Sequence, residues 1–114
     1  MLCEIGRWQV TKKNSKEHLE IWTEWMRYIR THRSKFDFAR SRLFIVETKG
    51  SDVEEWRWID EYPDRRAYGK TMRVLQTDAE ITKVKAKFMK EWESVRVPNS
   101  FTTEVWIEKP ELGV

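Results

Sequence analysis

The 114-residue sequence predicts one α+β domain with the element order strand, helix, strand, strand, helices, strand. Segments rich in aromatic and β-branched residues alternate with segments whose apolar residues recur every three or four positions, and these two patterns are typical of strands and helices. Turn-forming and helix-capping residues separate the segments. A chain of this length is expected to form a single domain, residues 1–114.

The first expected strand covers residues 2–10 and ends at a polar turn over residues 11–15. Asn14 or Ser15 is expected to cap the helix that follows, and Glu17 stands three residues after Asn14 in a capping-box arrangement. The sequence therefore predicts that a helix begins at this turn.

This first helix is expected to run to about His32. Its apolar residues recur at helical spacing, and they are Leu19, Trp22, Trp25, Met26 and Ile29. Phe36 and Phe38 lie in the C-terminal tail of the helix, and we expect both to pack back onto the core.

A hairpin is expected next, with strands over residues 42–49 and 55–62 joined by a turn at residues 50–52. Pro63 blocks continuation of the second of these strands, and Asp64 is well placed to cap the helix that follows.

The helical segment after Asp64 contains a second capping box, Thr77-Asp78-Ala79-Glu80, which predicts a break between two helices. The apolar residues on both sides of the break have helical spacing, and they are Tyr68, Met72, Leu75, Ile81, Val84, Phe88, Trp92 and Val95. Residues 97–99 are expected to end the second helix, and residues 101–109 to form the last strand.

This element order is the split βαβ, or ferredoxin-like, order. Right-handed crossovers place all helices on one face of a four-stranded antiparallel sheet. The strands over residues 42–49 and 101–109 nevertheless carry large apolar side chains on both faces, whereas a face open to water is expected to be polar. A second copy of the chain is the simplest cover, so we expect a homodimer through the sheet faces.

The segment Ile59-Asp60-Glu61-Tyr62-Pro63-Asp64, followed by Ala67-Tyr68, resembles the dimeric α/β-barrel superfamily. This group includes antibiotic-biosynthesis-type monooxygenases, EthD-like proteins and NIPSNAP-like proteins. The resemblance covers nearly the whole chain as an element pattern, and it implies two four-stranded sheets paired into a barrel with a small-molecule pocket. Several members place a histidine on the helix after the third strand, but residues 67–71 contain none, and this puts haem ligation and histidine-assisted oxygenation in doubt.

Charged residues in the two central strands indicate where a ligand site is expected, either between sheet and helices or inside the barrel. A charge in the middle of a sheet needs an ionic partner, water or a ligand beside it. A salt-bridge network is the alternative to a ligand pocket, and the sequence names no catalytic residue. The candidate ligand-binding residues are Arg7, Arg57, Trp58, Asp60 and Tyr68.

No metal ion, haem or flavin is expected as a cofactor, because the ligand sets and phosphate loops that hold these groups are absent from the sequence. His18 and His32 lie ~21 Å apart along the expected helix and cannot share a metal ion. We expect each of them at the surface or at a helix end. The single cysteine, Cys3, is expected as a small buried residue of the first strand.

The charge pattern limits the partners and the location. The net charge of +3 is too small to indicate a polyanion partner, and no apolar run approaches the ~18 residues that span a bilayer. With no signal-peptide pattern at the N-terminus, we expect a cytoplasmic protein with neither membrane nor nucleic-acid partners. Abundant Glu, Lys and Arg with only four Asn and Gln residues is typical of thermophiles, and predicts thermal unfolding above ~80 °C.

The RNA recognition motif has the same element order, and residues 56–62 resemble its aromatic third strand. Glu54 and Glu55 stand where that motif is basic, however, and residues 64–95 form a longer helical segment than the motif has. An RNA-binding module is therefore a less favoured interpretation.

The favoured function is a small-molecule-binding protein or a cofactor-independent monooxygenase-like or EthD-like enzyme, acting on an apolar or aromatic compound. A non-catalytic structural or ligand-binding homodimer is the alternative. A discrete pocket with convergent polar groups favours the enzyme, and a filled barrel favours the scaffold.

Overall fold

The computed structural model describes residues 1–114 and contains one four-stranded sheet. The strands are β1 (Leu2–Thr11), β2 (Arg40–Val46), β3 (Val53–Tyr62) and β4 (Thr102–Ile107). They lie in the order β2-β3-β1-β4, and every neighbouring pair is antiparallel. This is the ferredoxin-like fold, and the predicted α+β class is confirmed.

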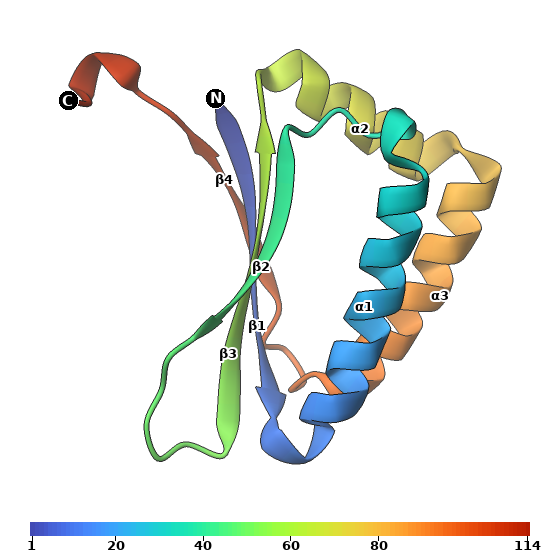
Figure 1. Ribbon diagram of the computed structural model, residues 1–114, viewed down its shortest axis with the longest axis vertical. Helices are drawn as coiled ribbons and strands as arrows, with labels where there is room; N and C mark the ends of the chain where they lie inside the picture. Colours follow the sequence, from blue (N-terminus) through green and yellow to red (C-terminus); the bar gives the residue numbers. More distant parts are fainter.

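All three α-helices cover one face of the sheet, and no α-helix covers the opposite face (Figure 1). The helices are α1 (Ser15–Thr31), α2 (Arg65–Thr77) and α3 (Ala79–Val95), with short 3-10 turns at Lys12–Asn14, Arg33–Lys35 and Pro110–Leu112. The predicted one-sided arrangement is therefore confirmed. None of the helices combines the length and the apolar character needed to cross a bilayer.

Two of the three predicted helix caps form. The Asp64 carboxylate accepts a hydrogen bond from the backbone N–H of Ala67 at 2.8 Å, and Asp78 does the same for Ile81 at 3.0 Å. Asp78 thereby separates α2 from α3, as its capping box predicts. The capping box expected at Asn14 is wrong, because the Asn14 amide instead donates to the carbonyl of Val95 at 3.3 Å.

The ends of the hairpin differ from the prediction. β2 begins at Arg40, opposite Glu61, and ends at Val46, so the strand is shifted towards the N-terminus relative to residues 42–49. Residues 47–52 form the connecting loop, in which Gly50 has a φ of 71°. The positive φ of this glycine is the reason that the turn closes there.

The core between sheet and helices is dominated by tryptophan. Trp8 of β1 stacks on Trp22 of α1 with ring centroids 5.1 Å apart, and Trp92 of α3 meets Trp8 edge-on at 5.0 Å. Edge-to-face contacts place the positive edge of one indole against the negative face of another. Phe36 and Phe38 are buried in the same layer, as predicted.

The buried face of α1 is rotated relative to the predicted stripe. His18, Ile21, Trp22 and Ile29 are buried, whereas Leu19 is exposed over 56% of its surface. The expectation of a surface position for His18 is therefore wrong. Its imidazole fills a site beside Trp8, whose indole N–H needs an acceptor that an apolar residue does not provide.

Cys3 is also placed differently from the prediction. It lies on the helix-free face of the sheet, opposite Trp106, and is only half-buried. Burial and the neighbouring carboxylate of Glu61 raise the pKa of its thiol, so the thiolate that a nucleophile requires is disfavoured.

Candidate functional site

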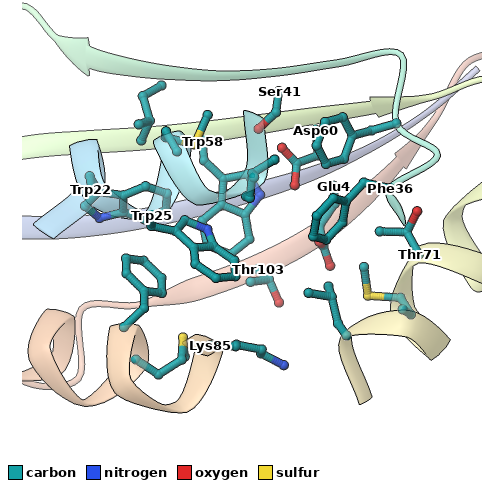
Figure 2. A pocket seen from close by; sticks show the side chains of 18 of the residues that line it. Glu4, Trp22, Trp25, Phe36, Ser41, Trp58, Asp60, Thr71, Lys85 and Thr103 are labelled. Atoms are coloured by element: carbon teal, nitrogen blue, oxygen red, sulfur yellow. The ribbon is translucent and has the colours of Figure 1, made fainter. Parts of the chain in front are cut away.

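A cavity of about 240 Å³ lies between the sheet and the helices. Fourteen of its twenty lining residues are hydrophobic. The aromatic ones come from all layers of the fold and are Trp22, Trp25, Phe36, Phe38, Trp58, Tyr62, Phe88 and Trp92. Figure 2 shows four of these side chains, Trp22, Trp25, Phe36 and Trp58, around a space that is also lined by Glu4, Asp60 and Lys85. Aromatic walls with a few convergent polar groups are typical of small-molecule sites.

The strand register decides which side chains reach this cavity. Glu4 of β1 is paired with Asp60 of β3, and Gly6 is paired with Trp58. Directly paired residues point to the same face of an antiparallel sheet. Glu4, Trp58 and Asp60 therefore face the helices together and form the floor of the cavity, and Gly6 lies beneath the Trp58 indole.

Gly6 creates the space that Trp58 occupies. A Cβ atom built on Gly6 would come within 2.5 Å of the Trp58 indole, far inside van der Waals contact. The indole therefore lies flat over the β1 backbone, which only glycine permits at this position. Gly6 thus fixes the depth of the cavity floor.

Asp60 is the most perturbed carboxyl group in the cavity. Burial raises its pKa to about 7, the Ser41 hydroxyl opposes the rise through a hydrogen bond, and the nearby Glu4 carboxylate adds to it. Ser41 is the direct partner of Asp60 on β2. A carboxyl group with a pKa near neutrality can take up or release a proton at physiological pH.

Glu4 connects Asp60 to the rim of the cavity. Burial raises the pKa of Glu4, while the hydroxyl of Tyr68 on α2, which donates to Glu4 Oε2 at 3.1 Å, and the charge of Lys85 lower it. The two carboxyl groups and the phenol form a row from the buried floor to the half-exposed Tyr68. Such a row can exchange a proton between the cavity and solvent.

Lys85 is the one cationic residue in the cavity wall. It lies on α3 in the same helical row as Ile81, Phe88 and Trp92, which are buried, and is itself half-buried. No carboxylate lies within 4.0 Å of its ammonium group. The apolar stripe of α3 thus includes an unpaired charge at the cavity.

The five candidate residues from the sequence do not form one site. Trp58 and Asp60 line the cavity, and Tyr68 reaches its rim through Glu4. Arg7 and Arg57 lie on the opposite face of the sheet, and neither lines the cavity. Arg57 and Trp58 are adjacent in one strand, so their side chains must point to opposite faces.

On the helix-free face each of the two arginines has an acidic neighbour. Arg7 is 2.6 Å from Glu104 of β4, and Arg57 is 3.6 Å from Glu55 of its own strand. Both pairs are partly exposed, which limits their contribution to stability. Within one chain, Arg7 and Arg57 therefore form salt bridges, which the sequence analysis gave as the alternative to a ligand pocket.

Two charged residues of the cavity wall, Glu4 and Lys85, were missed by the sequence analysis, as was Gly6 beneath Trp58. Glu4 has the same strand parity as Trp8 and Gly6, and Lys85 is one turn after Ile81 on the apolar row of α3. The strand parity of Glu4 and the helical spacing of Lys85 can be read from the sequence. They indicate a shared cavity only when the register of β1 against β3 is known.

No group of three His, Cys, Asp or Glu side chains is arranged to hold a metal ion. The expectation that the protein works without a metal ion, haem or flavin stays a prediction.

Several solved structures share this fold along almost the entire chain. An antibiotic biosynthesis monooxygenase matches 96% of this chain and 100% of its own at 16% identity, with a TM-score of 0.61. A dimeric ferredoxin-like protein from an uncultured marine organism covers 92% of both chains at 13% identity, with a TM-score of 0.65. SnoaB from Streptomyces nogalater, a cofactor-independent oxygenase, covers 99% of this chain and 97% of its own at 9% identity, with a TM-score of 0.62.

No family model matches the chain. The curated proteins contain no match either. At identities of 9–16% the structural likenesses establish the ferredoxin-like fold, and they confirm the predicted resemblance at that level.

Proposed function

We propose that this protein is a small-molecule-binding enzyme that takes an apolar or aromatic compound into the cavity and removes a proton from it with Asp60. The observation that carries the proposal is a carboxyl group of pKa about 7 in an aromatic-walled cavity. A general base is most effective when its pKa lies close to the working pH. Trp58 packs against the compound, and Tyr68 returns the proton to solvent through Glu4.

The proton-transfer step needs no cofactor. A C–H or O–H bond of the bound compound breaks, its proton goes to the Asp60 carboxylate, and the electron pair stays on the compound as a carbanion or an oxyanion. SnoaB is described as a cofactor-independent oxygenase. In an enzyme of that kind, dioxygen from solvent would accept the electron pair of the carbanion, and a CH2 group would become a carbonyl group while the second oxygen atom leaves as water. Without dioxygen, Asp60 would return the proton to a different atom of the carbanion, and the product would be an isomer.

A binding screen followed by an exchange assay tests this proposal. Aromatic compounds that raise the thermal midpoint are incubated with the protein in D₂O, and NMR follows the exchange of their C–H protons. The expected result is protein-dependent exchange that Asp60→Asn reduces at least ~100-fold, which is typical for loss of a general base. Asp52→Asn is the matched control, because Asp52 is exposed in the β2–β3 loop.

The alternative, a non-catalytic ligand-binding homodimer, predicts a different outcome. Compounds would bind with unchanged affinity to the parent and to the Asp60→Asn variant, and no exchange or oxygen consumption would follow. That result would remove the enzyme proposal and leave the binding function.

The helix-free face supports a proposed homodimer. Phe44, Val46 and Trp106 lie there with exposed fractions of 41%, 40% and 50%, and a structural neighbour is described as dimeric. Two such faces packed together would bury these groups and enclose Arg7 and Arg57 inside a barrel. A ligand role for the two arginines is proposed only for that enclosed space.

The same geometry disfavours an RNA-binding function. Trp56 and Trp58 of β3 point to the helices and pack in the tryptophan layer, with the Trp8 and Trp56 rings stacked at 6.5 Å. Bases stack on aromatic side chains that lie on an open sheet face, and these two side chains do not.

A further inference from the structure

The cavity has opposite charges on its two walls. The carboxyl groups of Glu4 and Asp60 come from the sheet, and the ammonium group of Lys85 comes from α3. Figure 2 shows Lys85 projecting from its helix into the space across from the two carboxyl groups. The remaining lining residues are apolar or carry a hydroxyl group. The line from the two carboxyl groups to the Lys85 ammonium group is therefore the one polar axis of the cavity.

The two carboxyl groups already have polar partners inside the protein, whereas Lys85 has none. Ser41 hydrogen-bonds to Asp60, and Tyr68 donates to Glu4. Lys85 is half-buried and lies near enough to Glu4 to lower the pKa of that group, yet it forms no ion pair. An ammonium group without an ionic partner, placed in the wall of a cavity, is free to pair with the carboxylate of a bound ligand.

We propose that the compound held in this cavity is a hydroxylated aromatic carboxylate, with its carboxylate on Lys85 and its hydroxyl group on Asp60. This inference rests on the proposed function and names the substrate class for the same site. The opposite polarity of the two walls allows one orientation only. A ligand turned end for end would place its carboxylate against Glu4 and Asp60, where like charges repel.

The size of the cavity limits the number of rings. At packing densities of roughly 0.5–0.75, a space of about 240 Å³ holds about 120–180 Å³ of ligand. That volume corresponds to two fused aromatic rings with small substituents. Trp58 lines the cavity from the sheet and Phe88 lines it from α3, so each offers an aromatic surface to a compound of this kind.

Four naphthalene probes test the inference by isothermal titration calorimetry. They are 6-hydroxy-2-naphthoate, 6-methoxy-2-naphthoate, 2-naphthol and 2-methoxynaphthalene. The hydroxy acid is expected to bind the parent protein about tenfold more tightly than 2-naphthol, because its carboxylate adds a charge-assisted contact to Lys85 that 2-naphthol lacks. The methoxy acid is expected to bind less tightly than the hydroxy acid, because it has no proton to donate to Asp60.

Variants at one position separate a ligand contact from a structural effect. Lys85→Met is expected to bind 2-naphthol as the parent does and to lose the tenfold preference for the hydroxy acid, while Lys85→Arg keeps that preference. Lys90→Met is the matched control, because Lys90 is exposed on the same helix and does not line the cavity. Thermal midpoints confirm that each variant is folded.

Two failures have different meanings. If the naphthalenes bind and Lys85→Met leaves their ratios unchanged, the substrate class proposed here is wrong and the cavity keeps its general function. If none of the four probes binds the parent protein, the proposal that the cavity binds aromatic compounds is wrong, and the inferred substrate class is overturned with it.

Discussion

The indole N–H of Trp8 donates a hydrogen bond to Nε2 of His18 at 2.8 Å, and both side chains are almost completely buried. The bond joins the central strand β1 to the first turns of α1. It requires the neutral form of the imidazole, because a protonated Nε2 has no lone pair to accept with. Burial lowers the pKa of His18 to about 4, and the nearby Glu54 carboxylate only partly opposes this effect.

The first prediction concerns this pair in mild acid. In the unfolded chain a histidine takes up its proton near pH 6.5, whereas folded His18 does so near pH 4. Its contribution is therefore fully present above pH 6.5 and is lost as the pH falls from about 6.5 to about 4, by up to ~3 kcal/mol. His18→Gln retains an acceptor for Trp8 and does not titrate, so this part of the pH dependence should disappear.

Urea unfolding followed by circular dichroism at several pH values between 4 and 8 measures the effect. His32→Gln is the comparison variant, because it removes the other histidine of the chain, which lies directly after α1. An unchanged slope in His18→Gln would contradict a neutral buried His18.

The second prediction concerns Asp60, whose effect on stability has the opposite sign. Its pKa is raised from 3.8 to about 7 on folding, so the folded chain binds the extra proton and stability is lost as the pH rises between these values. Asp60→Asn should therefore be more stable than the parent at pH 8 by about 2–4 kcal/mol, and the difference should vanish near pH 4. The other titratable groups lining the cavity are Glu4, Tyr62 and Lys85.

Thermal and urea unfolding of the parent and Asp60→Asn at pH 4, 6 and 8 test this directly, with Asp52→Asn as the exposed control. A variant that is less stable than the parent at pH 8 would show that Asp60 is held as an ionised structural group, and that it is not suited to accept a proton.

The third prediction concerns Gly6. Because a methyl group at this position would overlap the indole of Trp58, Gly6→Ala should push that ring into the cavity and destabilise the fold by ~1–3 kcal/mol. Near-ultraviolet circular dichroism should change, and binding of 2-naphthol should weaken. Gly69→Ala is the control, because nothing lies within 4 Å of the added group, and in the exposed interior of α2 it should add ~0.5–1 kcal/mol of stability.

A Gly6→Ala protein with parent-like stability and parent-like affinity for 2-naphthol would mean that the Trp58 side chain can adopt another conformation without loss of stability or binding. The floor of the cavity would then not depend on the glycine.

The sequence predicts the fold well because local signals determine most of it. Asp64 and Asp78 end loops and begin helices through their own carboxylates, and these interactions involve residues only three positions apart. His18 could not be predicted as buried, since its partner Trp8 belongs to a different element. An imidazole on a helix looks like a surface residue until the strand beneath it is known.

The candidate site was predicted only in part, for a similar reason. Trp58 and Asp60 share the parity of β3 that faces the helices, and Arg57 has the other parity. Which parity faces the helices depends on tertiary packing, because both faces carry large apolar groups. Lys85 shows the converse case, in which a charge within an apolar helical row looks like an ordinary surface lysine in the sequence.

The last prediction concerns assembly through the helix-free face. Two such faces, packed together, should bury well over ~1,000 Å² in total, the size expected of a specific interface. Light scattering at micromolar concentration should therefore give about twice the chain mass of 13.9 kDa. Trp106→Glu places a charge on the proposed contact face and should shift the protein to the monomer. Leu19→Glu replaces an equally exposed apolar residue of α1, on the helix side of the molecule, and should leave the dimer intact. A parent protein that scatters as a single chain at every concentration would exclude the dimer, and with it any role for Arg7 and Arg57 inside a barrel.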